Sequence, residues 1–207
     1  MKSKKIKVKK ENMDIIYGLI IGDGSLYNSS KGNALLDVAH CKEQKEYVEM
    51  KASLLREVAN IEVKVKEKPP TKNSNFLKYR FLTSKNEFWT ELMAEIYSFR
   101  NTKNKKKKRV TKNILNKFTI RTLGLWYMDD GYNCKDKNYI QLSIHDFTFE
   151  EAVLIKEWIF NITNCEFKIY KRKEQPFLVT YKDAEKFKKI IKENCNFIPE
   201  CMKYKFI

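Results

Sequence analysis

The sequence predicts an α+β protein made of two related half-domains, each with the element order α-β-β-α-β-β-α. An apolar segment that ends in aspartate and glycine occurs twice, as IIYGLIIGDG from Ile15 and as LGLWYMDDG from Leu123. Each copy is followed by strand residues and then by helix, strand, strand and helix patterns in the same order. A repeat of roughly 100 residues is too long for a solenoid, so we expect two pseudo-symmetric half-domains.

Helical spacing of apolar residues supports the predicted helices. The first helix after the apolar segment carries such a row at Tyr47, Met50, Leu54 and Val58. This period is typical of a helix with one buried face. Ser84 with Glu87, and Thr148 with Glu151, fit the capping box that satisfies free N–H groups at a helix start. We therefore expect helices to begin at both places.

Alternating residues mark the strands. Several segments place apolar side chains on one face and polar or basic side chains on the other, which is typical of an antiparallel sheet with one buried face. Exposed lysines often serve only to solvate a surface, but the pattern occurs in both halves. A positive sheet surface can enter the major groove and contact base edges. The side chains expected on this DNA-binding surface are Lys64, Lys66, Lys78, Arg80, Gln141, Lys168, Tyr170 and Arg172.

The charge predicts a polyanionic partner. Among 207 residues, lysine and arginine number 42 against 26 acids, a formal net charge of +16. Nucleic acid is the first expectation and an anionic membrane surface the second. No apolar run approaches the roughly 20 residues that a bilayer requires, so we expect no membrane insertion. The five cysteines are odd in number and form no CxxC pair. We therefore expect reduced thiols in an intracellular compartment, such as a bacterial or phage-infected cytoplasm or an organelle matrix.

Composition divides the chain into four parts. We expect a flexible basic arm at 1–12, a first half-domain at 13–100, a basic linker at 101–118 and a second half-domain at 119–207. The linker contains the run KKKKR. Such a run is usually solvated, although contact with a nucleic-acid backbone fits it equally well.

The two apolar segments predict paired, buried helices that bring Asp23 and Asp130 together. The first segment is hydrophobic almost all round, which is typical of a helix buried on every side. Gly18 and Gly22 lie four residues apart and favour close approach to another helix. Two carboxylates at neighbouring helix C-termini repel each other and the helix dipoles. Mg²⁺ would remove this repulsion, and acids beneath a basic groove suggest metal-assisted phosphodiester hydrolysis. A plain Asp-Gly turn is the alternative for either acid alone.

These residues resemble the paired motifs of the LAGLIDADG homing endonucleases, and most closely the intron-encoded monomers with two motifs in one chain. IYGLIIGDG and LGLWYMDDG carry the resemblance, with LDVAHCKEQKEYVEMK, SIHDFTFEE and FIPECMKYK in support. The resemblance covers roughly residues 13–205. It implies motif helices at a central interface, and sheets that form a saddle over a long, asymmetric double-stranded DNA site.

The resemblance also implies the roles of several residues. Asp23 and Asp130 would bind two or three divalent ions and cut one strand each. The preceding residues, Gly22 and Asp129, join them as candidate metal ligands, although for Asp129 we favour a place in the interface. A basic residue beside each centre corresponds to Lys205 in the second half and to Lys107 or Lys108 in the first.

The second motif departs from the first. When the two acids are aligned, Gly18 matches Leu125 and Gly22 matches Asp129. Gly124 lies one residue earlier and is the remaining small residue expected at the helix interface. His40 and His145 both follow apolar strands, where each could contact water near a metal or be a satisfied polar residue at a strand end. We favour the second interpretation.

Three functions are compatible with these features. The first is a Mg²⁺-dependent, sequence-specific DNA endonuclease that acts as a monomer. The alternatives are a maturase that binds its host intron RNA, and a DNA-binding relative without catalysis. The presence of both motif acids favours the nuclease.

Overall fold

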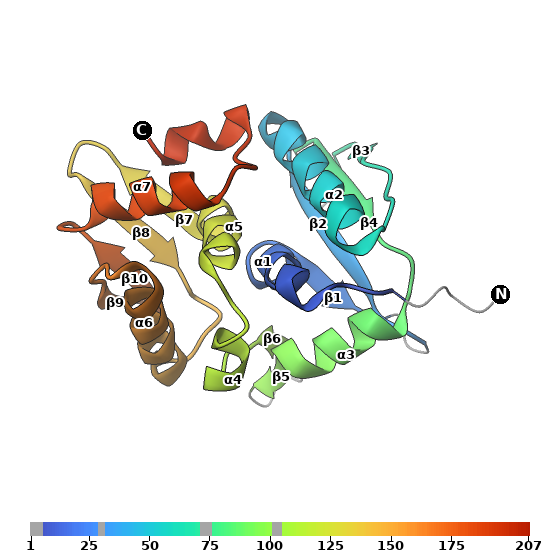
Figure 1. The fold of residues 1–207 in the computed structure, drawn as a ribbon, viewed down its shortest axis with the longest axis horizontal. Helices are drawn as coiled ribbons and strands as arrows, with labels where there is room; N and C mark the ends of the chain where they lie inside the picture. Colours follow the sequence, from blue (N-terminus) through green and yellow to red (C-terminus); the bar gives the residue numbers. More distant parts are fainter. Residues whose placement is uncertain (1–5, 29–31, 71–75, 101–104) are drawn as a thin grey trace.

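A computed structural model describes residues 6–28, 32–70, 76–100 and 105–207 of the chain (Figure 1). The order of helices and strands in the two halves is the predicted one. The first half consists of α1 (Met13–Ile21), β1 (Ser25–Tyr27), β2 (Leu35–Cys41), α2 (Lys45–Ala59), β3 (Lys66–Lys68), β4 (Lys78–Leu82) and α3 (Glu87–Ile96). The second consists of α5 (Ile120–Asp130), β7 (Gly131–Cys134), β8 (Tyr139–Ser143), α6 (Phe149–Thr163), β9 (Lys168–Arg172), β10 (Gln175–Thr180) and α7 (Ala184–Asn194).

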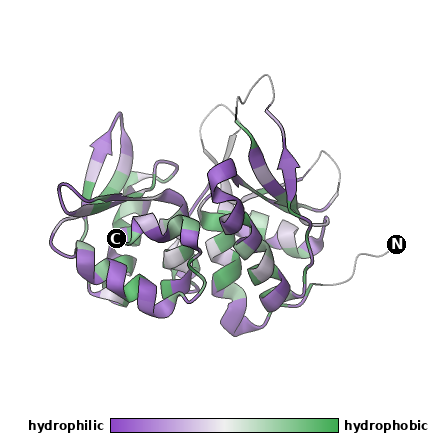
Figure 2. Cartoon of the chain, turned by 90° about the horizontal axis from the view of Figure 1, so that it is seen from above, coloured by the Kyte–Doolittle hydropathy of each residue, from purple (hydrophilic) through white to green (hydrophobic). Residues whose placement is uncertain are grey.

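Each half contains a four-stranded antiparallel sheet with the same topology. The strand orders are β1-β2-β4-β3 and β7-β8-β10-β9, so the four strands follow the same path in both sheets. Figure 2 shows the strands above a layer of helices. The buried positions of β2 and β8 alternate with partly exposed ones, as the sequence pattern predicts. The predicted α+β saddle of two half-domains is thus confirmed.

The interface between the halves is a parallel pair of helices, α1 and α5, which lie side by side at the centre of Figure 1. At their N-terminal ends, the buried carboxylate of Asp14 accepts hydrogen bonds from Thr119 and Arg121. Along the contact, a Cβ on Gly18 would lie 2.6 Å from Leu125 Cδ1. The absence of a side chain at Gly18 therefore lets α1 pack closely against α5.

Glycine serves the interface at two of the three predicted positions. A Cβ on Gly22 would lie 2.2 Å from Asp129 Oδ2, so Gly22 also faces α5. Gly124 does not face α1, and this part of the prediction is wrong. A Cβ there would lie 2.4 Å from Cys195 Sγ at the end of α7, because one residue turns the helix face by about 100°.

The segment predicted as a linker contributes to the core. Its described part holds β6 (Lys105–Lys108), which pairs with β5 (Tyr97–Arg100), and the short helix α4 (Lys112–Leu115). The buried side chains of this segment are Val110, Ile114, Leu115 and Phe118. Residues 101–104 of the linker and 1–5 of the arm lie outside the described residues. The described remainder of the arm includes Ile6 and Val8, which pack against the core.

Helix starts agree with the capping predictions in one case and differ in the other. Thr148 and Glu151 form the predicted capping box at the start of α6. At α3, Asn86 caps the helix by accepting from the N–H of Phe88, so the Ser84–Glu87 prediction is wrong. Asparagine at the N-cap position satisfies the free N–H groups without a partner further along. Among the described helices, none has the length and apolar character to span a membrane.

Candidate active site

Asp23 and Asp130 line one cavity of about 290 Å³ between the halves. Asp130 ends α5, and Asp23 follows α1 after Gly22. The two helices are parallel, so their C-terminal ends meet at the same end of the interface and carry both acids there. The cavity is also lined by Ile21, Gly22, Ser25, Lys108, Ser143, Ile144, His145, Asp146 and Phe147. The predicted meeting of the two acids is therefore present in the structure.

Ionisation of both acids is disfavoured. Burial raises the pKa of Asp130 to about 7, and the negative charges of Asp129 and Asp23 act in the same direction. Burial and the Asp129 charge also raise the pKa of Asp23, whose side chain is 45% exposed. Such a cluster of negative charge with incomplete compensation is typical of a site that receives a cation.

A lysine lies against the last carbonyl groups of each motif helix. Lys108 donates to the carbonyls of Ile21 and Gly22 at the end of α1. Lys205 donates to the carbonyls of Met128 and, at 3.1 Å, of Asp129 at the end of α5. Burial lowers the pKa of both ammonium groups, while the nearby acids oppose this shift. The two lysines thus offset the partial negative charge of the helix ends beside the acids.

The structure distinguishes between the two lysines considered for the first half. Lys108 contacts the end of α1 and lines the cavity. Lys107 instead forms an ion pair with Asp146 at 3.0 Å, and the Lys107 side chain is 40% exposed. Adjacent residues of strand β6 point to opposite faces, so only one of the two reaches the helix end.

Asp129 lies inside the interface and is held by the first half. Its side chain is fully buried, and Oδ2 accepts from the backbone N–H of Asp23 at 2.9 Å. Oδ1 accepts from Lys51 Nζ at 2.6 Å and from the hydroxyl of Tyr47 at 2.8 Å. Burial opposes ionisation of Asp129, but the charge of Lys51 holds its pKa below the usual value. Since both oxygens have protein partners, the structure supports the interface role that we favoured.

Sequence reasoning did not identify Lys51 or Tyr47 as residues of the site. Both lie on α2, where a lysine would ordinarily face solvent, yet both are fully buried. A signal was nevertheless present in the spacing. Lys51 lies four residues after Tyr47 and three before Leu54, within the apolar row of that helix.

The two histidines occupy different environments. His40 is buried, and its Nδ1 lies 3.5 Å from Asp23 Oδ2. Burial and the adjacent Lys51 charge lower the pKa of His40 to about 4, so its ring is neutral at physiological pH. His145 is exposed and lines the cavity. The first histidine is therefore a buried, hydrogen-bonded group and the second is open to solvent.

The predicted DNA-facing side chains emerge from both sheets. Lys66 and Lys78 are exposed on β3 and β4, and Lys64 is exposed just before β3. Arg80 is engaged by Asp37 through two hydrogen bonds of 2.6 and 2.7 Å. In the second half, the exposed side chains are Lys168, Tyr170 and Arg172 of β9, with Gln141 partly exposed on β8.

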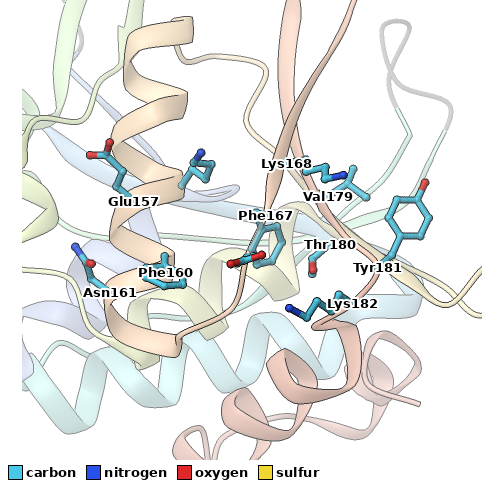
Figure 3. A pocket seen from close by; sticks show the side chains of 11 residues that line it. Glu157, Phe160, Asn161, Phe167, Lys168, Val179, Thr180, Tyr181 and Lys182 are labelled. Carbon is cyan, nitrogen blue, oxygen red and sulfur yellow. The ribbon is translucent and has the colours of Figure 1, made fainter.

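Another cavity, of about 720 Å³, lies between α6 and the strands β9 and β10 (Figure 3). It is lined by apolar groups such as Phe160 and by lysines such as Lys156 and Lys182. Neither motif acid lies in it. Its size therefore does not make it the catalytic centre, and the smaller cavity holds the acids.

The donor set around the smaller cavity fits a hard divalent cation. Carboxylate oxygens are preferred ligands of Mg²⁺, Mn²⁺ and Ca²⁺. Asp23 and Asp130 supply such oxygens, and their raised pKa values mean that a cation would stabilise their ionised form. Asp23, His40 and Asp129 could also form a metal-binding group, since their ligand atoms lie within 4.8 Å of one another. In that group, however, the Lys51 ammonium already contacts Asp129 and His40.

Solved structures of similar fold support this description. The chain is similar to the homing endonuclease I-WcaI bound to its DNA recognition sequence, with a TM-score of 0.76 and 21% identity over 97% of this chain and 88% of that one. It is also similar to I-DmoI in complex with DNA and Mn, with a TM-score of 0.55 and 16% identity over 88% and 96% of the two chains. Full-length DUF199/WhiA from Thermatoga maritima matches with a TM-score of 0.53 and 13% identity over 94% and 58%. At these identities, the likeness concerns the fold.

Sequence comparison identifies the family. No curated protein matches the chain significantly. The model of the LAGLIDADG DNA endonuclease family, however, matches residues 13–190, which include both motif helices and both sheets. The interface of two motif helices, with one acid at the end of each, agrees with this match. The chain therefore belongs to the LAGLIDADG DNA endonuclease family.

Proposed function

We propose that this nuclease, as a monomer, cuts both strands of a long, asymmetric DNA site with divalent metal held by Asp23 and Asp130, Mg²⁺ being the physiological ion. The observation that supports this most strongly is the shared cavity of the two acids, which come from different halves of one chain. Because both halves are present in the same chain, no second copy is needed to complete the pair. The free cysteines support a reducing intracellular location.

The chain's own residues would bind the DNA and prepare the reacting phosphates. A divalent ion held by the acids would supply positive charge to the phosphate and lower the pKa of a water molecule. Lys108 and Lys205 neutralise the helix ends on which the acids lie. Their lowered pKa values make the two ammonium groups readier than ordinary lysines to give up a proton. Exposed lysines on both sheets would neutralise backbone phosphates along the site.

The test begins with the target sequence. Purified protein is incubated with Mg²⁺ and a plasmid library that carries randomised sites, and the ends of linearised DNA are sequenced on both strands. We expect one preferred asymmetric sequence with a fixed offset between the two cuts. Mn²⁺ and Ca²⁺ in place of Mg²⁺ then establish which ions support cleavage.

The acids are tested on the selected target. Asp23→Asn and Asp130→Asn should each slow cleavage at least about 1,000-fold on one strand or both, because each removes a charged ligand. Gel-shift affinity for the target should survive, since DNA contacts from the sheets remain. Continued double-strand cutting by the variant with both substitutions would refute the assignment.

A further inference from the structure

Asp23 is contacted by Asp129 and His40, and the buried Lys51 contacts both of these residues. The side chains of Lys51 and Asp129 are both fully buried, and their ion pair spans the interface at 2.6 Å. The same ammonium lies 3.0 Å from His40 Nε2. Lys51 thus bonds to two groups, each of which contacts Asp23.

The first contact reaches the backbone of Asp23. Asp129 Oδ1 receives Lys51 and Tyr47, which leaves Oδ2 directed at the Asp23 N–H, 2.9 Å away. A buried carboxylate with fixed donors on one oxygen has little freedom to rotate. Asp129 is also the residue before Asp130, so this bond links the backbone positions of both acids.

The second contact reaches the side chain of Asp23. An ammonium group has hydrogen-bond donors only, so the His40 nitrogen that faces Lys51 is the acceptor. In the neutral ring, the proton therefore lies on Nδ1, which faces Asp23 Oδ2 at 3.5 Å. Lys51 in this way selects the tautomer that presents an N–H to the Asp23 carboxylate.

The second half lacks this arrangement. Helices α2 and α6 both have 15 residues and end at an asparagine in the left-handed conformation, and the ninth residue before it is Lys51 in α2 but Ile155 in α6. Strand pairing gives the equivalent of His40 in the second half. Ser25, two residues after Asp23, pairs with Asp37, and Tyr132, two residues after Asp130, pairs with Gln141. His40 and Ile144 each lie three residues beyond these partners, so the second half has isoleucine at the position of His40. Asp130 instead accepts a hydrogen bond from Trp126 at 3.1 Å.

We propose that Lys51 is a positioning residue of the first active site, which holds the backbone of Asp23 through Asp129 and its side chain through His40. This inference rests on the proposed function, in which Asp23 is a metal ligand. Lys51 does not touch the reacting atoms. Its effect is to fix where the first acid stands relative to the second.

The first measurement uses the unaltered protein and needs no DNA target. The chain has two histidines, so nitrogen NMR of the imidazole rings gives a simple spectrum. We expect His40 to be neutral with its proton on Nδ1, opposite to the tautomer that free histidine favours. A proton on Nε2 of His40 in the unaltered protein would overturn the proposal.

The second measurement uses the double variant Lys51→Met/Asp129→Asn, which removes both charges of the buried pair and keeps its volume and an acceptor oxygen. We expect the His40 tautomer preference to be lost and single-turnover cleavage to slow at least tenfold, with DNA affinity within about twofold of the original. Ile155→Met is the matched control, since it places methionine at the equivalent position of α6. It should leave both measurements unchanged.

The outcomes separate this proposal from the proposed function. If the original protein cuts its target and the double variant cuts equally fast, the positioning role is wrong and the nuclease assignment stands. If the original protein cuts no target under any metal, the nuclease assignment fails, and the tautomer measurement alone decides whether Lys51 orients His40. A tautomer that is unchanged in the double variant would also overturn the positioning role.

Discussion

The two halves share a backbone plan but differ in how each motif acid is surrounded. Beside Asp23, the first half has a buried polar network of His40, Tyr47 and Lys51. At the position of Lys51, the second half has a buried Ile155. At the residue before the acid, it is the second motif that is charged: it has Asp129 where the first motif has Gly22. The side chain of Asp129 fills the space beside Gly22, and its charge is paired with Lys51 of the first half.

This difference shows how a repeated fold can acquire two unequal centres. The strand orders are preserved, as is the 15-residue length of α2 and α6, because they depend on apolar pattern and chain path. The buried polar groups depend on complementary partners, which need to exist only once across a shared interface. Backbone symmetry therefore does not require the two acids to be equally acidic or equally mobile.

The largest expected effect comes from breaking the buried ion pair. Lys51→Met alone leaves Asp129 charged and unpaired in the interface, which should lower the free energy of unfolding by about 3–5 kcal/mol. Adding Asp129→Asn should restore most of this loss, because the uncompensated charge is then removed. Urea denaturation of the two variants measures both values. A double variant no more stable than the single one would contradict the pair's role.

The second test concerns the acid without a lysine partner of this kind. The pKa of Asp130 is about 7 in the folded protein against a reference value of 3.8, so its ionisation destabilises the fold. The protonated carboxyl of Asp130 therefore favours the folded state, and this stabilisation is complete below pH 4 and is lost as the pH rises through 7. Asp130→Asn should therefore stabilise the metal-free protein at pH 8 by up to about 4 kcal/mol, and have little effect at pH 4.

The control for this titration is the difference between variant and original protein at each pH. His40, with a lowered pKa of about 4, favours the unfolded state as the pH falls below about 6.5 and so opposes the Asp130 effect. Because both proteins contain His40, subtracting the stability of the original protein from that of the variant at each pH cancels the His40 contribution. Thermal unfolding in a metal chelator gives the data, and a destabilising effect of Asp130→Asn at pH 8 would contradict the raised pKa of Asp130.

The third test changes side-chain volume at the interface of α1 and α5, with a larger residue at Gly18 and a smaller one at Leu125. Gly18→Ala places a methyl group 2.6 Å from Leu125 Cδ1 and 3.2 Å from the Cα of Thr122, and should cost about 1–3 kcal/mol through overpacking. Leu125→Ala should cost about 2–5 kcal/mol through a cavity. Because the two positions touch, the double variant should lose less than the sum. Strict additivity in denaturation measurements would show that the helices do not pack as described.

The smallest expected effect is on the salt dependence of DNA binding, which distinguishes a charged contact with DNA from an aromatic one. Lys168→Gln on β9 should reduce the slope of log affinity against log salt by about 0.9, since one phosphate contact is removed. Tyr170 stacks on Phe177 with ring centroids 5.8 Å apart, and Tyr170→Leu should leave the slope unchanged. Binding titrations between low and moderate salt distinguish them. An unchanged slope for Lys168→Gln would remove that lysine from the phosphate contacts.

Local sequence pattern was sufficient to predict the architecture and the positions of the two motif acids. The repeated apolar segments, the alternating strands and the Thr148–Glu151 capping box each rest on periodicities of neighbouring residues, and the structure confirms them. The motif acids were predictable because each directly follows a buried segment. The capping of α3 by Asn86 was missed because several polar residues near that helix start could serve as the cap.

The sequence by itself determined the number of halves, the order of their helices and strands, the positive charge and the two motif acids. Only the tertiary structure decided that Lys51 serves the first centre and that Lys108, rather than Lys107, contacts the end of α1. Lys51 lies within the apolar row of an amphipathic helix and Lys108 within a lysine run, and both acquire their roles from carboxylate and carbonyl groups that are distant along the chain. Hydrogen bonds and ion pairs act over a few ångströms in space, so local spacing can indicate that Lys51 faces the core but cannot identify partners 78 or 86 residues away.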